Sequence, residues 1–167
     1  MRNCLWLVFI ACIMSSCGSQ SYFVVRHAEK AVVPANTQGM SATDPPLTDS
    51  GKLRAQDLKT TLLGEKIHFV FSTNTIRTRE TAEPTRAHFG LTTATYSPVP
   101  TDEFINQLKA LKGNTLIVGH SNTVDDIVNK LTGEKLLSDL PETEYNHLFL
   151  VMKKGKKWKF RSLTYGR

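Results

Sequence analysis

Residues 22–29 read Tyr-Phe-Val-Val-Arg-His-Ala-Glu, an apolar run that ends in an arginine and a histidine. Four consecutive aromatic and β-branched residues predict a buried strand. Two later runs have the same form, because Ile67–Phe71 leads into Ser72 and Thr115–Val118 leads into Gly119-His120. Continuous apolar strands of this kind are typical of parallel sheets that are buried on both faces.

Helical segments alternate with these strands. Apolar residues recur at helical spacing from Thr48, a candidate N-cap, as far as Leu62. Pro84 is expected to bend or break the next helix along the chain. The remaining expected elements are helices at Ile76–Phe89, Phe104–Leu111 and Val124–Leu131, an edge strand at Tyr96–Pro100, and strands at Leu148–Met152 and Trp158–Leu163.

This alternation predicts an α/β fold, a three-layer sandwich in which helices cover both faces of a mostly parallel sheet. Such sheets carry their sites beyond the carboxyl ends of the strands. The first strand ends in Arg26 and His27, the second leads to Arg77, and the third ends at His120. Two histidines and two arginines are therefore expected to meet at one edge of the sheet.

These four side chains suit phosphoryl transfer. Guanidinium groups offer several donors to phosphoryl oxygens and stay charged at any relevant pH. A neutral histidine can attack phosphorus, and the labile phosphohistidine that results can be hydrolysed by water. The pattern thus predicts a phosphatase that needs no metal and no other cofactor.

Four segments resemble the signatures of the histidine phosphatase superfamily, which also contains the phosphoglycerate mutases. They are Arg26–Glu29, Leu47–Ala55, Phe71–Pro84 and Gly119–Asn122, and they occur in the family's order. The resemblance, to the short branch 1 type, implies a phosphoglycerate mutase-like fold. It also implies that His27 is the nucleophile, and that Arg26, Arg77 and His120 bind the phosphoryl group.

A carboxylic acid is expected to protonate the leaving oxygen. Family members often carry it after the edge strand, where this chain has Asp102 and Glu103. Both residues also open a predicted helix, where the helix dipole alone favours acids. Glu103 is the preferred catalytic candidate, while Asp102 and Glu29 stay open.

The first residues are typical of an export signal. Arg2 precedes an apolar run at 5–14, which is shorter than the roughly 20 residues that a membrane-spanning helix needs. Met14-Ser15-Ser16-Cys17 resembles a bacterial lipobox, which implies that Cys17 is lipidated and becomes the mature N-terminus. A plain signal peptide and a short N-terminal anchor are the alternatives.

The predicted organisation is therefore a signal peptide at 1–16, the lipidated cysteine and a linker at 17–20, and a histidine phosphatase domain at 21–167. This predicts a protein of the cell envelope, anchored by lipid on the periplasmic or outer-membrane side. Neither the face of the outer membrane nor the oligomeric state follows from the pattern.

The formal net charge of +6 suits a phosphorylated substrate, nucleic acid or an anionic membrane. The basic turn at Lys153–Lys159 favours a solvated hairpin tip, with contact to anionic lipid headgroups as the sharper interpretation. Aromatic residues are sparse among these lysines, so nucleic acid is not an expected partner. The expected partners are a phosphorylated small molecule, with a phosphoprotein as an alternative, and a membrane reached through the lipid anchor.

Other functions are compatible with the same four side chains. A phosphomutase would need a cap that excludes water, and the short segment between Phe89 and Phe104 leaves little room for one. A phosphohistidine protein phosphatase needs only an open pocket. A non-catalytic phosphate-binding lipoprotein would keep the arginines and histidines without an acid. The leading prediction is a phosphatase that acts on phosphomonoesters.

Overall fold

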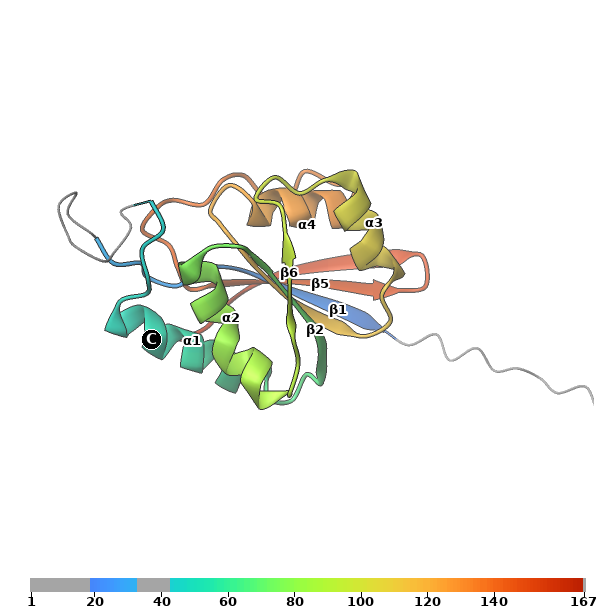
Figure 1. The fold of residues 1–167 in the computed structure, drawn as a ribbon. Helices are drawn as coiled ribbons and strands as arrows, with labels where there is room; N and C mark the ends of the chain where they lie inside the picture. The colour runs from blue at the N-terminus through green and yellow to red at the C-terminus, as the bar shows by residue number, and fades with distance from the viewer. Residues whose placement is uncertain (1–18, 33–42, 167) are drawn as a thin grey trace, which may run out of the picture.

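The computed structural model describes residues 19–32 and 43–166, and the predicted signal peptide and Cys17 lie outside this part. The elements of the described part are β1 (Gln20–Arg26), α1 (Asp49–Leu62), β2 (Ile67–Thr73), α2 (Ile76–His88), β3 (Thr93–Tyr96), α3 (Asp102–Ala110), β4 (Asn114–Gly119), α4 (Val124–Thr132), β5 (His147–Lys154) and β6 (Lys157–Thr164) (Figure 1). In the same residues, no helix is long and apolar enough to cross a membrane.

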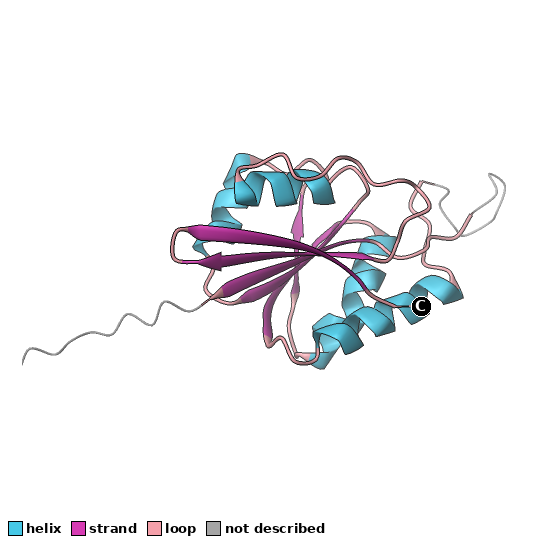
Figure 2. Cartoon of the chain, turned by 180° about the vertical axis from the view of Figure 1, so that it is seen from behind, coloured by secondary structure: helices cyan, strands magenta, loops and turns pink. Residues whose placement is uncertain are grey.

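The strands form one sheet in the order β3-β2-β4-β1-β5-β6. The first four of these strands are parallel, β5 pairs with β1 in the antiparallel sense, and β6 does the same with β5. Helices α1 and α2 lie on one face of the sheet, and α3 and α4 lie on the other (Figures 1 and 2). The predicted three-layer α/β sandwich is confirmed.

Each face of the sheet carries its own core because successive strand residues point to opposite sides. In β1, Tyr22 and Val24 pack with α3 and α4, while Phe23 and Val25 pack with α1 and α2. All four side chains are buried. The run of apolar residues in β1 therefore reflects a strand covered on both faces.

Two details of the prediction were wrong. The edge strand is Thr93–Tyr96 rather than Tyr96–Pro100. Tyr96 instead ends the strand, and its hydroxyl donates to the Val118 carbonyl over 3.1 Å. The prolines at 98 and 100 lack the N–H that a strand ladder needs. Of the two effects expected of Pro84, the break does not occur, because α2 is continuous to His88 with a buried face made of Thr78, Thr81, Ala82 and Thr85.

The start of α1 is fixed to the turn that follows β1. Thr48 is the N-cap, as predicted, and its hydroxyl accepts from the Gly51 N–H over 3.0 Å. Its backbone N–H donates to the Glu29 carbonyl over 2.9 Å. A side chain at position 51 would overlap that same carbonyl, so only glycine fits this contact.

Gly51→Ala should therefore lower the free energy of unfolding by about 1–3 kcal/mol, the usual cost of overpacking. Urea denaturation would measure the loss. Gly64→Ala is the matched control, because a Cβ there meets no atom within 4 Å and should change stability by less than about 0.5 kcal/mol. Equal effects of the two substitutions would show that the close approach at Gly51 does not constrain the fold.

Candidate active site

The pairing of β1 with β4 brings the two predicted histidines together. Arg26 lies opposite Gly119 in the parallel register. The backbone N–H of His27 donates to the Gly119 carbonyl over 2.8 Å. His27 and His120 therefore sit side by side, with ring centroids 5.5 Å apart. Both side chains are buried, with 3% and 9% of their surface exposed.

Arg77 reaches this pair from the first turn of α2. One of its terminal nitrogens, Nη2, lies 3.5 Å from Nδ1 of His120, and the other forms a 3.2 Å ion pair with Asp44. Arg26 lies beside His27 at the end of β1, and its guanidinium packs 4.4 Å from the ring centre of Tyr145. The structure thus brings together all four residues that the sequence placed at the site.

His27 is held as a neutral imidazole with one free nitrogen. Its Nδ1 lies 2.8 Å from the Ala28 carbonyl oxygen. Because a carbonyl only accepts, Nδ1 must carry the hydrogen, which leaves the lone pair on Nε2. Burial, and then the positive charges of Arg26 and Arg77, lower the pKa of His27 from 6.5 to about 3. His27 therefore keeps its nucleophilic lone pair throughout the neutral range.

A chain of threonine hydroxyls holds His120 in the opposite tautomer. The Thr78 hydroxyl lies within 3.0 Å of three acceptors, which are the carbonyl oxygens of Thr73 and Thr75 and the hydroxyl of Thr75, so its hydrogen has partners other than the Thr73 hydroxyl. The Thr73 hydroxyl then donates to Thr78 over 3.0 Å and accepts from His120 Nε2 over 2.9 Å. Nε2 of His120 therefore carries the hydrogen, and Nδ1 faces Arg77 as an acceptor.

The same surroundings disfavour the charged form of His120. Burial, and then the charges of Arg77 and Arg26, lower its pKa from 6.5 to about 4. A histidine in the unfolded chain titrates near 6.5. Between these pH values the unfolded chain binds more protons than the folded one. The contribution of both histidines to stability is therefore complete above about pH 6.5 and is lost as the pH falls.

The guanidinium groups of Arg26 and Arg77 use only some of their N–H donors in hydrogen bonds to the protein. Nη1 of Arg26 donates to the carbonyls of Pro141 and Glu144 over 2.8 and 3.2 Å, and Nη2 pairs with Glu142 over 2.9 Å. The Nε atoms of Arg26 and Arg77 are buried and have no acceptor among the described residues. A buried charged donor without a partner is costly. Both Nε–H groups are therefore suited to bind an anion.

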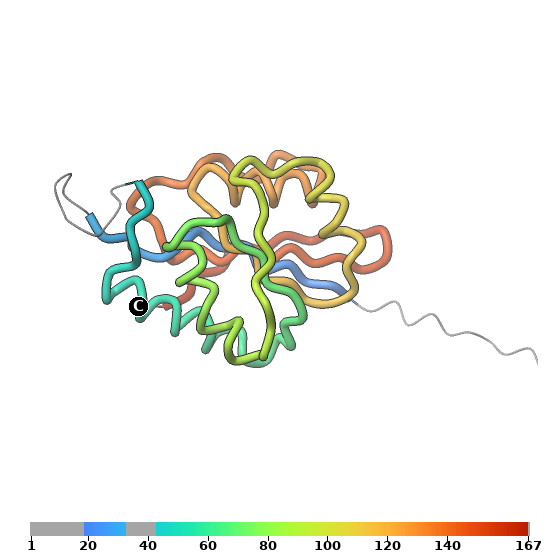
Figure 3. Tube along the Cα trace, in the orientation of Figure 1, coloured from blue at the N-terminus to red at the C-terminus, as the bar shows by residue number. Residues whose placement is uncertain are grey.

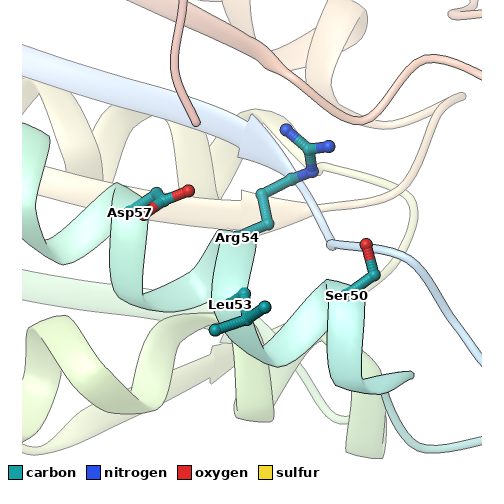
Figure 4. Close-up of a pocket in the computed structure, with 4 residues that line it drawn as sticks. All are labelled: Ser50, Leu53, Arg54 and Asp57. Carbon is teal, nitrogen blue, oxygen red and sulfur yellow. The ribbon is translucent and has the colours of Figure 1, made fainter. Parts of the chain in front are cut away.

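None of the three candidate acids has a contact in the described structure that ties it to these four side chains. Asp102 forms a 2.6 Å ion pair with Lys130 on the protein surface. Glu103 is exposed in the first turn of α3 and has no hydrogen bond or ion pair to the four residues. Glu29 is held by Arg54, which points from α1 toward the end of β1 (Figure 4). The identity of the general acid stays a prediction.

Glu142 is a site residue that sequence reasoning missed. Its carboxylate pairs with Arg26 and accepts from the Ser121 hydroxyl over 3.0 Å. That bond, and the charges of Arg26 and Lys30, lower the pKa of Glu142. Helix α4 follows Thr123 without a side-chain cap, and the Thr123 hydroxyl donates instead to the Pro98 carbonyl over 2.8 Å. No local motif marks Glu142, which is brought to the site by the loop between α4 and β5.

Asp44 was missed for the same reason. It accepts from the backbone N–H of Ile76 over 2.9 Å and pairs with Arg77. Arg26 and Arg77 thus each form an ion pair with one carboxylate, that of Glu142 and that of Asp44. Among residues 19–32 and 43–166, no group of three or more His, Cys, Asp or Glu side chains is placed to hold a metal ion.

A neutral histidine with a free Nε2 lies beside the buried Arg26 and near the partly buried Arg77, at the carboxyl edge of a parallel sheet. This arrangement is chemically suited to hold a phosphoryl group next to a nucleophilic nitrogen. Residues 22–98 match the sequence profile of the histidine phosphatase superfamily (branch 1). The matched region contains Arg26, His27 and Arg77.

Solved structures share the fold at low sequence identity. An Escherichia coli protein provisionally named alpha-ribazole-5'-P phosphatase has a TM-score of 0.67 and 18% identity, over 88% of this chain and 97% of its own. The protein histidine phosphatase SixA complexed with tungstate gives 0.66 and 20%, over 86% and 96%. Phosphoglycerate mutase from Bacillus anthracis gives 0.58 and 16%, over 87% and 92%. No protein with a curated description is similar in sequence.

The two imidazoles should titrate far below the usual value. In the ligand-free protein, NMR titration of the ring resonances should give midpoints near pH 3 for His27 and near pH 4 for His120, because burial and two arginines disfavour their charged forms. The variants His27→Ala and His120→Ala would assign the signals. A midpoint near pH 6.5 for either ring would contradict this description of the site.

Thr73→Val is the control for the tautomer of His120. It removes the acceptor for Nε2–H. The nitrogen chemical shifts of the His120 ring, which should report a protonated Nε2 and an unprotonated Nδ1 in the wild type, should therefore change. Those of His27 should not change. Thr73→Ser keeps the hydroxyl and should restore the pattern. Unchanged shifts in Thr73→Val would show that the hydroxyl chain does not hold this ring.

Proposed function

We propose that this chain is a metal-independent phosphatase that hydrolyses phosphomonoesters through a phosphohistidine on His27. The observation that carries the proposal is the hydrogen bond from Nδ1 of His27 to the Ala28 carbonyl, which leaves Nε2 free as a nucleophile. The neighbouring Nε–H groups of Arg26 and Arg77 are buried donors suited to the phosphoryl oxygens.

In the first step the lone pair of His27 Nε2 forms a bond to phosphorus. The bond between phosphorus and the leaving oxygen breaks, and that oxygen takes up a proton. Water then attacks the phosphohistidine, the P–N bond breaks, and its electron pair returns to Nε2. Inorganic phosphate leaves, and His27 is neutral again.

The other side chains act on the charge of the phosphoryl group. Arg26 and Arg77 stabilise the oxygens that gain charge as phosphorus is attacked. A dianion beside His120 favours the protonation of its Nδ1, which then becomes a further donor. The carboxylate of Glu142 holds Nη2 of Arg26 in an ion pair, which leaves the Nε–H of Arg26 for the phosphoryl oxygens.

His27→Ala should abolish the hydrolysis of p-nitrophenyl phosphate by the domain that begins at Gly18, because no other side chain supplies the nucleophile. His88→Ala is the matched control, since His88 is exposed at the end of α2, and should keep full activity. EDTA should leave the wild-type rate unchanged. Loss of activity with EDTA that a divalent metal restores would contradict the proposed mechanism.

Trapping the intermediate distinguishes the alternatives on the same site. A phosphatase should yield a phosphoryl label on His27 that acid releases and alkali does not. A phosphomutase would instead pass the label to a second position of the substrate with little release. Binding of phosphate without turnover by the wild type would identify a phosphate-binding protein. Turnover confined to phosphohistidine peptides would identify a protein phosphatase.

We further propose that the protein is exported and anchored to the cell envelope through Cys17. The support is the apolar run at 5–14, followed by Ser15-Ser16-Cys17. The first strand begins at Gln20, so only a short segment separates the anchor from the folded domain. The proposed location is the periplasmic or outer-membrane side of a bacterial membrane.

In a bacterial host, Cys17→Ala should abolish labelling of the full chain with radioactive palmitate, because the thiol is the acceptor. The variant should also leave the membrane fraction. Cys12→Ala removes a thiol within the apolar run and should keep the label. Retention of the label by Cys17→Ala would exclude this cysteine as the anchor.

A further inference from the structure

The positive charge of the chain is concentrated at the edge of the sheet opposite the active site. We call this group the lysine face. Its members lie where the parallel strands begin or where β5 turns into β6, and they are Lys66, Lys109, Lys112, Lys153, Lys154, Lys156 and Lys157. In Figure 3 the hairpin of β5 and β6 lies at the same end of the molecule as the start of β1.

Acidic residues are scarce around this face. The sequence has no Asp or Glu between Phe104 and Val124, and none between Tyr145 and Gly166. Glu65 is an acid beside Lys66 at this end. Carboxylates gather instead at the catalytic edge, where Asp44 and Glu142 pair with the site arginines. The net charge of the chain therefore does not surround the substrate site.

Protection of a sheet edge does not account for these lysines. Charged residues on β6 would discourage pairing with another chain, since β6 is an edge strand. Lys66, Lys109 and Lys112, however, lie outside β6. Lys66 precedes β2, Lys109 lies in α3 and Lys112 precedes β4, and both β2 and β4 are inner strands. The lysines share one end of the molecule rather than one strand.

An aromatic side chain lies among these lysines. Trp158 stacks on Tyr22 with ring centroids 6.0 Å apart. The ammonium groups of Lys109 and Lys153 lie 5.7 and 5.3 Å from the centre of its ring. Tryptophan flanked by cationic side chains is typical of surfaces that meet lipid headgroups.

The chain enters the fold through the same face. Gln20, the first residue of β1, pairs with Lys153. The N–H of Ser21 donates to the Asn114 side chain over 3.1 Å, which places the start of β1 beside the start of β4. An anchor at Cys17 would therefore hold this face, rather than the catalytic edge, against a bilayer.

We propose that the lysine face docks on an anionic lipid surface, with the active site directed away from it. β1 has seven residues, so the two edges are about 20 Å apart. This distance leaves the catalytic edge open to substrates from the aqueous side. The proposal does not depend on the phosphatase activity, so each can fail without the other.

The test uses the domain that begins at Gly18, which contains every described element and both cores. Solved relatives that consist almost wholly of the matched region fold on their own. Vesicles of phosphatidylcholine with an equal amount of phosphatidylglycerol should bind the domain at low salt. Vesicles of phosphatidylcholine alone should not. Trp158 is the sole tryptophan of this domain, so its emission should shift on binding.

Lys154→Gln/Lys156→Gln/Lys157→Gln should weaken binding about a hundredfold, because each basic residue near an anionic surface contributes roughly fivefold. The control Lys52→Gln/Lys59→Gln/Arg79→Gln makes the same change in charge on α1 and α2 and should keep most of the binding. Both variants should unfold at the wild-type temperature in a thermal melt, which checks that they are folded.

Three results would overturn the proposal. These are equal binding of the wild-type domain to neutral and anionic vesicles, equal losses in the two triple variants, and a Trp158 emission that does not respond to anionic vesicles. Tight binding to single-stranded RNA at a salt concentration that abolishes vesicle binding would also overturn it, because the face would then recognise a different polyanion.

Discussion

The site depends on the crowding of four basic side chains into one buried edge of the sheet. Burial, and then two guanidinium groups that cannot lose their charge, keep the two imidazoles neutral. The parallel pairing of β1 with β4 sets this arrangement, because it places the residues that follow the two strands, His27 and His120, side by side. The carboxylates of Asp44 and Glu142 offset the remaining charge from the outside.

The two histidines use opposite ring nitrogens to bind the protein, so they are held in different tautomers. His27 gives its Nδ1 hydrogen to a carbonyl and keeps Nε2 free for the reaction. His120 gives its Nε2 hydrogen to a threonine and turns Nδ1 toward Arg77. Each tautomer is set by a neighbour that can only accept, directly for His27 and through the hydroxyls of Thr73 and Thr78 for His120.

The architecture and the four central residues could be predicted because their signals are local. A buried strand that ends in a polar residue marks the catalytic edge, as for His27 and His120. The outer carboxylates could not be predicted, since Glu142 reaches Arg26 only through a loop between α4 and β5 that carries no pattern of its own. The edge strand was misplaced because Tyr96 satisfies its hydroxyl at the end of the strand, a contact made across the sheet. The candidate acids had no geometric test in the sequence, because an acid that opens a helix is favoured there with or without catalysis.

The position of β1 also bears on when the chain can fold. Its two neighbours are β4 and β5, which end at Gly119 and Lys154, so the earliest strand to leave the ribosome is among the last to find its partners. Until most of the chain has been synthesised, the centre of the sheet cannot form. The topology itself therefore postpones the folding of the sheet until most of the chain has left the ribosome.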